Sequence, residues 1–102
     1  MGIRLDHIGI ATEDIEQASK FWNVLGLIQG TDETNVEQGV NIRFFGTSSG
    51  SEPKVELLEP LGEDTPIGKF LNKRGPGIQQ LAFEVDGLED TIRRLMSEGI
   101  RM

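Results

Sequence analysis

The spacing of apolar residues divides the first part of the chain into a strand and a helix. Residues 5–12 alternate between apolar and polar or small side chains, which is typical of a half-buried strand. Asp14, with Gln17 three residues later, provides a helix cap, and Gly26 ends the helix. The apolar positions between them fall at helical spacing and predict one buried face, made of Ile15, Ala18, Phe21, Trp22 and Leu25.

The middle of the chain predicts further strands and a short helix. The expected strands cover residues 26–31, 36–45 and 54–59. In the second of these, the even-numbered residues from Val40 to Phe44 share one face, because side chains alternate along a strand. Residues 47–53 are rich in turn-forming side chains and predict a loop. A helix begins with Thr65 as its cap and Pro66 at its first position.

The C-terminal part of the chain repeats the pattern of its beginning. Residues 78–85 alternate like residues 5–12, and a helical pattern follows that ends at Gly99. The two segments align without a gap at an offset of 73 residues. Strand, cap, helix and terminal glycine coincide over about 23 residues, which a duplicated β-α-β-β-β unit would explain.

The repeat predicts an α+β fold of paired βαβββ units in a single domain over residues 1–102. The first unit covers residues 3–60, a connector with a short helix covers residues 61–77, and the second unit covers residues 78–102. By comparison with the first unit, we expect the second to be incomplete here, with about 30 further residues and three strands beyond this chain. A sheet that stops at this point has an unpaired edge, which predicts self-association.

Composition and charge narrow the classes of function. The chain has 102 residues, with 10 basic and 17 acidic side chains and a net charge of −7, so nucleic-acid binding is not expected. No apolar run approaches the roughly 18 residues of a membrane span, and no signal peptide opens the sequence. The chain has no cysteine, which excludes disulfides and thiolate chemistry. Together these features favour a cytoplasmic protein.

Three polar residues on the predicted strands could bind a metal ion. His7, the only histidine, alternates with Leu5 and Gly9, and is either a ligand or a strand histidine with a backbone partner. Glu56 lies between apolar neighbours and points either to solvent or to the interior, where it would need a cation or a hydrogen-bond donor. Gln80 is equivalent to His7 at the offset of 73 residues. It is either an ordinary polar strand residue or an oxygen ligand suited to cobalt, manganese or magnesium.

Four segments of this sequence resemble the methylmalonyl-CoA epimerases, a family of the vicinal oxygen chelate (glyoxalase and bleomycin-resistance-like) superfamily. They are residues 6–11 (DHIGIA), 37–40 (EQGV), 55–62 (VELLEPLG) and 66–71 (PIGKFL). The similarity runs from residue 3 to residue 102, and the segments at 55–62 and 66–71 are more particular to the epimerases than the first, which is shared across the superfamily. The resemblance implies the vicinal oxygen chelate fold, which is built from paired βαβββ units.

The family implies an isomerase that interconverts (2R)- and (2S)-methylmalonyl-CoA by removing the α-proton, with an enolate as intermediate. It also implies a bound divalent metal, typically Co²⁺ (with Mn²⁺, Ni²⁺, Mg²⁺ or Zn²⁺ as other candidates), and a homodimer. His7 and Glu56 match family ligands, whereas Gln80 stands where the family carries a histidine. The family's general-base glutamate falls beyond residue 102, so no catalytic base is assigned. Contacts to the coenzyme A moiety of the acyl-CoA substrate are expected from basic residues, with Arg43, Lys54, Lys69 and Arg74 as candidates.

Two other functions are compatible with the same residues. A glyoxalase-type lyase, such as lactoylglutathione lyase, would share His7 and Glu56 but act on hemithioacetals of glutathione. A metal-free module that binds small molecules on the same fold is favoured by the pair Gln79-Gln80, which replaces two histidines of the epimerase strand. The metal content of the protein distinguishes this module from both enzymes.

Overall fold

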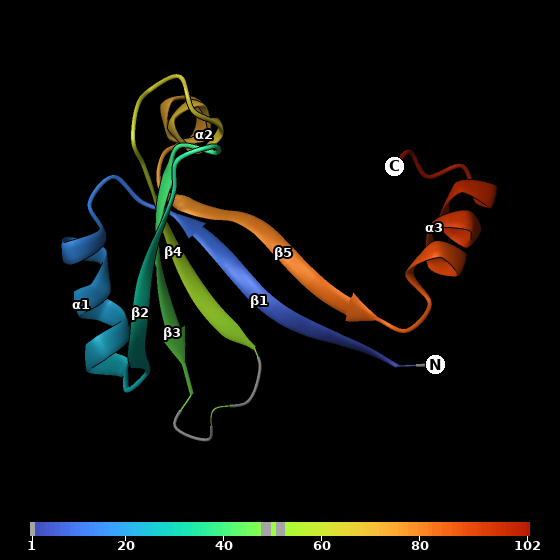
Figure 1. The fold of residues 1–102 in the computed structure, drawn as a ribbon, viewed down its shortest axis with the longest axis horizontal. Coiled ribbons are helices and arrows are strands. Elements are labelled where there is room, and N and C mark those ends of the chain that lie inside the picture. Colours follow the sequence, from blue (N-terminus) through green and yellow to red (C-terminus); the bar gives the residue numbers. More distant parts are fainter. Residues whose placement is uncertain (1, 48–49, 51–52) are drawn as a thin grey trace.

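The computed structural model describes residues 2–47, 50 and 53–102, which form a mixed five-stranded sheet with three helices (Figure 1). The strands are β1 (Ile3–Ala11), β2 (Ile28–Asn35), β3 (Val40–Gly46), β4 (Lys54–Pro60) and β5 (Gly77–Val85). The helices are α1 (Ile15–Leu25), α2 (Pro66–Arg74) and α3 (Leu88–Ser97). Within the described residues, no helix is long and apolar enough to cross a membrane.

The strands follow the order β2-β3-β4-β1-β5 across the sheet. β1 pairs in parallel with β4, and the other neighbouring strands pair antiparallel. The elements β1, α1, β2, β3 and β4 therefore form the predicted βαβββ unit, in which α1 and the β2–β3 hairpin return the chain to the side of β1. β5 occupies the other side of β1, so β1 lies between two strands that are distant from it in sequence.

The pairing of β1 with β5 has an internal symmetry at the offset of 73 residues. Gly9 pairs with Gln80, which is the equivalent of His7. His7 pairs in turn with Ala82, which is the equivalent of Gly9. Ile8 pairs with Leu81, which is its own equivalent. Two copies of one strand that meet antiparallel about a local two-fold axis produce this register, with the axis passing through the Ile8–Leu81 pair.

The helix α1 packs on one face of the sheet. Ile15 joins Phe45, Val55 and Leu57 in a buried cluster, against which Trp22 packs. The predicted cap is confirmed, because the Asp14 carboxylate accepts a hydrogen bond from the Gln17 amide. Gly26 ends the helix with φ 113°, a left-handed conformation that glycine adopts without strain.

The predicted apolar face of α1 is only partly correct. Phe21 and Leu25 are 63% and 61% exposed, whereas Ser19 is buried. The face toward the sheet runs through Ile15, Ala18, Ser19 and Trp22, at spacings of three and four residues. Ser19 is tolerated there because its hydroxyl donates to the Ile15 carbonyl and accepts from the guanidinium of Arg43.

The helix α2 covers one end of the opposite face. Ile67 and Leu71 pack with Ala11, Val40 and Leu58 in a second buried cluster. The predicted start of α2 is confirmed, because the Thr65 hydroxyl accepts a hydrogen bond from the Gly68 amide at 3.0 Å and Pro66 stands at the first helical position.

The strand predicted for residues 36–45 begins later, at Val40, and the strand predicted for residues 26–31 extends to Asn35. The Asn35 side chain accepts a hydrogen bond from the Gln38 amide, and the Gly39 amide bonds to the Val36 carbonyl, so residues 36–39 form the hairpin turn. Every residue of β2 is exposed, and its pairing with β3 holds this polar segment extended. Of the predicted loop 47–53, residues 48, 49, 51 and 52 lie outside the described residues.

The strand β5 and the helix α3 expose large apolar side chains. Leu81 and Phe83 of β5 are 56% and 55% exposed, and Leu88 and Met96 of α3 are 61% and 59% exposed. α3 has no buried residue and stands away from the sheet beyond the end of β5 (Figure 1).

Candidate functional site

The three predicted ligands lie on one face of the sheet, the face on which α2 packs. Glu56 alternates with Val55 and Leu57, which face α1, so the Glu56 side chain points to the opposite side. Gly9 pairs with Glu56 on one side and with Gln80 on the other. Directly opposite residues share a face of the sheet. Glu56, Gly9 and Gln80 therefore form a row across β4, β1 and β5.

The absence of a side chain at Gly9 allows Gln80 to lie over β1. A Cβ atom on Gly9 would lie 2.5 Å from the Gln80 Cγ and 2.9 Å from its amide nitrogen. The Gln80 side chain therefore occupies the space above Gly9, in the direction of Glu56. The strand signal at residues 78–85 located Gln80, but the role of Gly9 depends on pairing that the sequence does not show.

His7 is oriented by a bulge in β1. Leu5 pairs with Phe83 and His7 with Ala82, so Asp6 is an extra residue in β1, and the predicted alternation of Leu5 with His7 is interrupted. The Asp6 Oδ2 lies 2.7 Å from the His7 Nδ1. Because a carboxylate only accepts hydrogen bonds, this contact places a proton on Nδ1 and leaves Nε2 with a free lone pair.

The positive charges near the Glu56 carboxylate do not fully offset the effect of its burial. Its side chain is only 16% exposed, and its Oε2 lies 3.5 Å from the His7 Nδ1. Burial raises the pKa of Glu56, while the charges of His7 and Lys54 act in the opposite direction. A carboxylate that is buried in this way is stabilised by an additional cation.

The donor set at this place is one imidazole, one carboxylate and one amide. Among the residues that the structure describes, no group of three histidine, cysteine, aspartate or glutamate side chains could hold a metal ion. Gln80 adds an amide oxygen to this face, a neutral group of the type that hard divalent cations accept.

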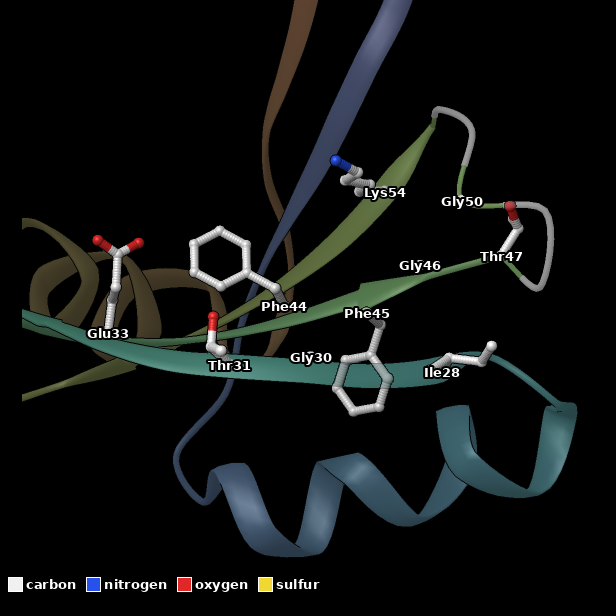
Figure 2. Close-up of a pocket in the computed structure, with 10 residues that line it drawn as sticks. All are labelled: Ile28, Gly30, Thr31, Glu33, Phe44, Phe45, Gly46, Thr47, Gly50 and Lys54. Atoms are coloured by element: carbon white, nitrogen blue, oxygen red, sulfur yellow. The ribbon is translucent and has the colours of Figure 1, made fainter.

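A cleft of about 660 Å³ adjoins these residues on the same face (Figure 2). Two of its lining residues pair directly with candidate ligands, since Phe44 is opposite Glu56 and Lys54 is opposite His7. The lining residues are Ile28, Gly30, Thr31, Glu33, Phe44, Phe45, Gly46, Thr47, Gly50 and Lys54. Glu33, whose carboxylate also lines the cleft, was not predicted from the sequence. β2 is mostly polar, so no alternation of apolar and polar residues indicates which of its side chains share a face.

The four basic residues considered for substrate contacts are now separated. The Arg43 guanidinium lies on the α1 side of the sheet, where it binds Asp32 at 2.9 Å, Ser19 at 3.0 Å and Glu16. Lys69 and Arg74 belong to α2. Lys54 alone of the four lines the cleft.

A family model described as the Glyoxalase/Bleomycin resistance protein/Dioxygenase superfamily matches residues 6–102. The ethylmalonyl-CoA/methylmalonyl-CoA epimerase of Cereibacter sphaeroides is 36% identical over 101 residues, which are 97% of this chain and 73% of that protein. The mitochondrial methylmalonyl-CoA epimerase of Bos taurus is 37% identical over 97% of this chain, which spans 56% of the bovine protein. The crystal structure of methylmalonyl-CoA epimerase from Mycobacterium tuberculosis is 44% identical with a TM-score of 0.80, covering 95% of this chain and 65% of that chain.

Proposed function

We propose a function from the premise that this chain belongs to the Glyoxalase/Bleomycin resistance protein/Dioxygenase superfamily and, within it, to the methylmalonyl-CoA epimerases. The chain epimerises (2R)- and (2S)-methylmalonyl-CoA, or an acyl-CoA closely related to it, by removal and return of the α-proton. The three relatives compared above carry this activity in their names, and the chain spans 56 to 73% of their lengths.

The observation that carries the proposal is the convergence of His7, Glu56 and Gln80 on one face of the sheet, with Gly9 between the last two. These side chains bring an imidazole, a buried carboxylate and an amide to one face of the sheet, which is a set of donors that divalent metal ions accept. We infer that they hold such an ion, with Co²⁺ as the first candidate. A divalent ion there would supply electrostatic stabilisation of the negative charge that develops on the thioester oxygen.

The chain's own residues bind and orient the reacting groups. Asp6 holds the imidazole of His7 in place through Nδ1. The cleft beside the ligand group offers the aromatic ring of Phe44 and the carboxylate of Glu33 to an acyl chain that extends from it (Figure 2). We infer that the acyl group lies next to the candidate ligands and that the rest of the substrate extends along the open cleft.

Exchange of the α-hydrogen of methylmalonyl-CoA in deuterated water tests the proposal. We expect exchange that depends on added Co²⁺, disappears with a chelator and is lost in His7→Ala. Glu84→Gln, which removes a surface ion pair with Arg4, should retain it. Absence of exchange in the Co²⁺-loaded wild-type chain would contradict the proposal, and turnover of a glutathione hemithioacetal instead would indicate a lyase.

The amide at Gln80 favours a second candidate, a module of the same fold that binds small molecules without metal. An amide oxygen binds transition metals more weakly than the imidazole that it replaces. Metal analysis of the purified protein and a Co²⁺ titration separate the two, because the module would bind no Co²⁺ and would show equal ligand affinity with and without chelator.

We also propose that the chain is organised as one βαβββ unit (residues 3–60), a connector (61–77) and the strand and helix of a second unit (78–102), and that it forms a homodimer. The symmetric register of β1 with β5 supports the duplication. The exposed apolar side chains of β5 and α3 support association with a second chain.

A further inference from the structure

We propose that Lys54 is the anion-binding residue of this site, and that its ammonium group binds the free carboxylate of a malonyl-type acyl group. The inference rests on the proposed function and adds the residue that selects a dicarboxylic acyl chain over a simple one.

The position of Lys54 follows from two strand pairings. Lys54 opens β4 and pairs with His7 of β1, about 4.8 Å away across the sheet. Glu56 lies two residues further along β4, on the same face, about 6.6 Å from Lys54 along the strand. Figure 2 shows the Lys54 side chain on the same side of the sheet as the ring of Phe44 and the carboxylate of Glu33. The ammonium group therefore faces the space next to the His7 and Glu56 side chains.

The ammonium group of Lys54 has no ion-pair or hydrogen-bond partner among the described residues. No ion pair or hydrogen bond joins it to a side chain within residues 2–47, 50 and 53–102, whereas Arg4, Arg43 and Arg93 have carboxylate partners. Lys54 is also the one cation among the described residues that line the cleft. In a chain with a net charge of −7, this single positive group in the wall of the cleft can attract an anion to one place.

The field of Lys54 reaches the candidate ligands. Lys54 pairs directly with His7 across the sheet and lies two residues before Glu56 on the same face of β4. An anion beside Lys54 would therefore lie close to the place where the α-carbon of the substrate reacts.

This closeness favours the acyl carboxylate over the phosphates of coenzyme A. The carboxylate is bonded directly to the α-carbon, whereas the phosphates lie at the far end of the pantetheine arm. A carboxylate has two oxygens and about four lone pairs, so it can accept from an ammonium group while it also faces the His7 and Glu56 group.

Comparison of malonyl-CoA with acetyl-CoA tests the inference, because the two differ by the carboxylate alone. Calorimetric titrations with the Co²⁺-loaded 102-residue chain should show that the wild type binds malonyl-CoA about tenfold more tightly than acetyl-CoA. Lys54→Met should abolish this preference and leave the affinity for acetyl-CoA within about twofold, while Lys54→Arg should keep most of it. Lys20→Met, on α1 at the other face of the sheet, is the matched control and should behave as the wild type.

The α-hydrogen exchange assay, run on the same proteins, distinguishes a failure of the Lys54 inference from a failure of the epimerase proposal. If wild-type exchange proceeds and Lys54→Met keeps the preference for malonyl-CoA, or loses affinity for both ligands equally, the inference is overturned while the epimerase proposal stands. If the wild type neither exchanges the α-hydrogen nor binds either ligand, both are overturned. A loss of the preference together with an increased KM for methylmalonyl-CoA supports both.

Discussion

At the scale of single residues, the bulge in β1 brings the Asp6 carboxylate onto the His7 imidazole. The contact has two consequences: it fixes the ring, and it selects the nitrogen that keeps a lone pair. Asp6 is next to His7 in sequence, where strict alternation would put the two side chains on opposite faces. The bulge is therefore the feature that gives this strand histidine a fixed orientation.

We expect Asp6→Asn to reduce the affinity for Co²⁺ by about 10- to 100-fold, because an amide does not hold the Nδ1 proton as a carboxylate does. Titration of the protein with Co²⁺, followed by its absorption spectrum, measures the change. Asp64→Asn, in the loop before α2, is the control and should bind Co²⁺ as the wild type does. Equal affinity in Asp6→Asn would show that His7 needs no orienting partner.

The contact between Gly9 and Gln80 gives a second prediction at this scale. Gly9→Ala should destabilise the fold by about 1–3 kcal/mol, because its Cβ meets the Gln80 side chain at 2.5 Å and the pair must rearrange. Urea denaturation measures the loss. Adding Gln80→Ala should restore most of it, since the truncated side chain leaves the space above residue 9 free. A double variant that is no more stable than Gly9→Ala would assign the loss to the strand backbone instead.

The candidate ligands could be found from the sequence, but their arrangement could not. His7 stood out as the only histidine, Glu56 as a carboxylate among apolar neighbours, and Gln80 through the repeat. The bulge at Asp6 and the row through Gly9 depend on which strands pair and in which register. Those facts come from contacts between β1, β4 and β5, whose sequence separation places them outside the reach of local patterns.

At the scale of elements, α1 is attached to the sheet by a buried cation as well as by apolar packing. The Arg43 guanidinium is 8% exposed and joins β3 to Glu16 and Ser19 of α1 and to Asp32 of β2. Its aliphatic part fills space under the helix, and its charged end is satisfied by hydrogen bonds. The sequence pattern predicted α1 correctly but placed Phe21 and Leu25 on its buried face. A search for apolar residues alone cannot find this face of α1, because the face includes Ser19 and contacts Arg43 of β3.

The Arg43–Asp32 pair predicts a dependence of stability on pH. The Arg43 guanidinium lowers the pKa of Asp32 below 3.8, its ordinary value. A carboxyl group with a lower pKa in the folded state stabilises the fold above its unfolded pKa, and this contribution is lost as the pH falls through the folded pKa. Because Asp32 is about half exposed, the contribution should be about 1 kcal/mol or less.

Urea denaturation between about pH 3 and about pH 6 measures this contribution. The free energy of unfolding should fall more steeply with acidification in the wild type than in Asp32→Asn. Asp90→Asn, which removes an exposed pair with Arg93 on α3, is the control for the loss of a surface carboxylate. Parallel curves for the wild type and Asp32→Asn would rule out this source of acid sensitivity.

At the scale of the whole molecule, apolar surface is distributed unevenly. The first βαβββ unit buries its two clusters under α1 and α2, whereas β5 and α3 leave Leu81, Phe83 and Met96 more than half exposed. β5 is also an edge strand, with one side free of pairing in the described sheet. The internal repeat made this asymmetry predictable, because it indicated a second unit that begins at residue 78.

We expect the 102-residue chain to self-associate through this region. Sedimentation velocity should show an increase in mass as the protein concentration rises. Phe83→Lys should shift the association to higher concentration, because a charge on an edge strand opposes pairing with another chain. Val24→Lys on α1, where the side chain is 88% exposed, controls for the loss of an exposed apolar residue elsewhere. A monomer at all concentrations would contradict the expectation.

The central place of β1 also determines how the chain reaches this structure. β1 is made first, yet its partners β4 and β5 begin at residues 54 and 77, so both of its pairings must close long loops. Contacts between such distant segments slow the search for the native state, and the β2–β3 hairpin can form well before them. His7, Glu56 and Gln80 belong to those three distant strands, so the binding group comes into existence only when the slowest pairings are complete. Refolding followed by Co²⁺ binding would therefore report the last step of folding.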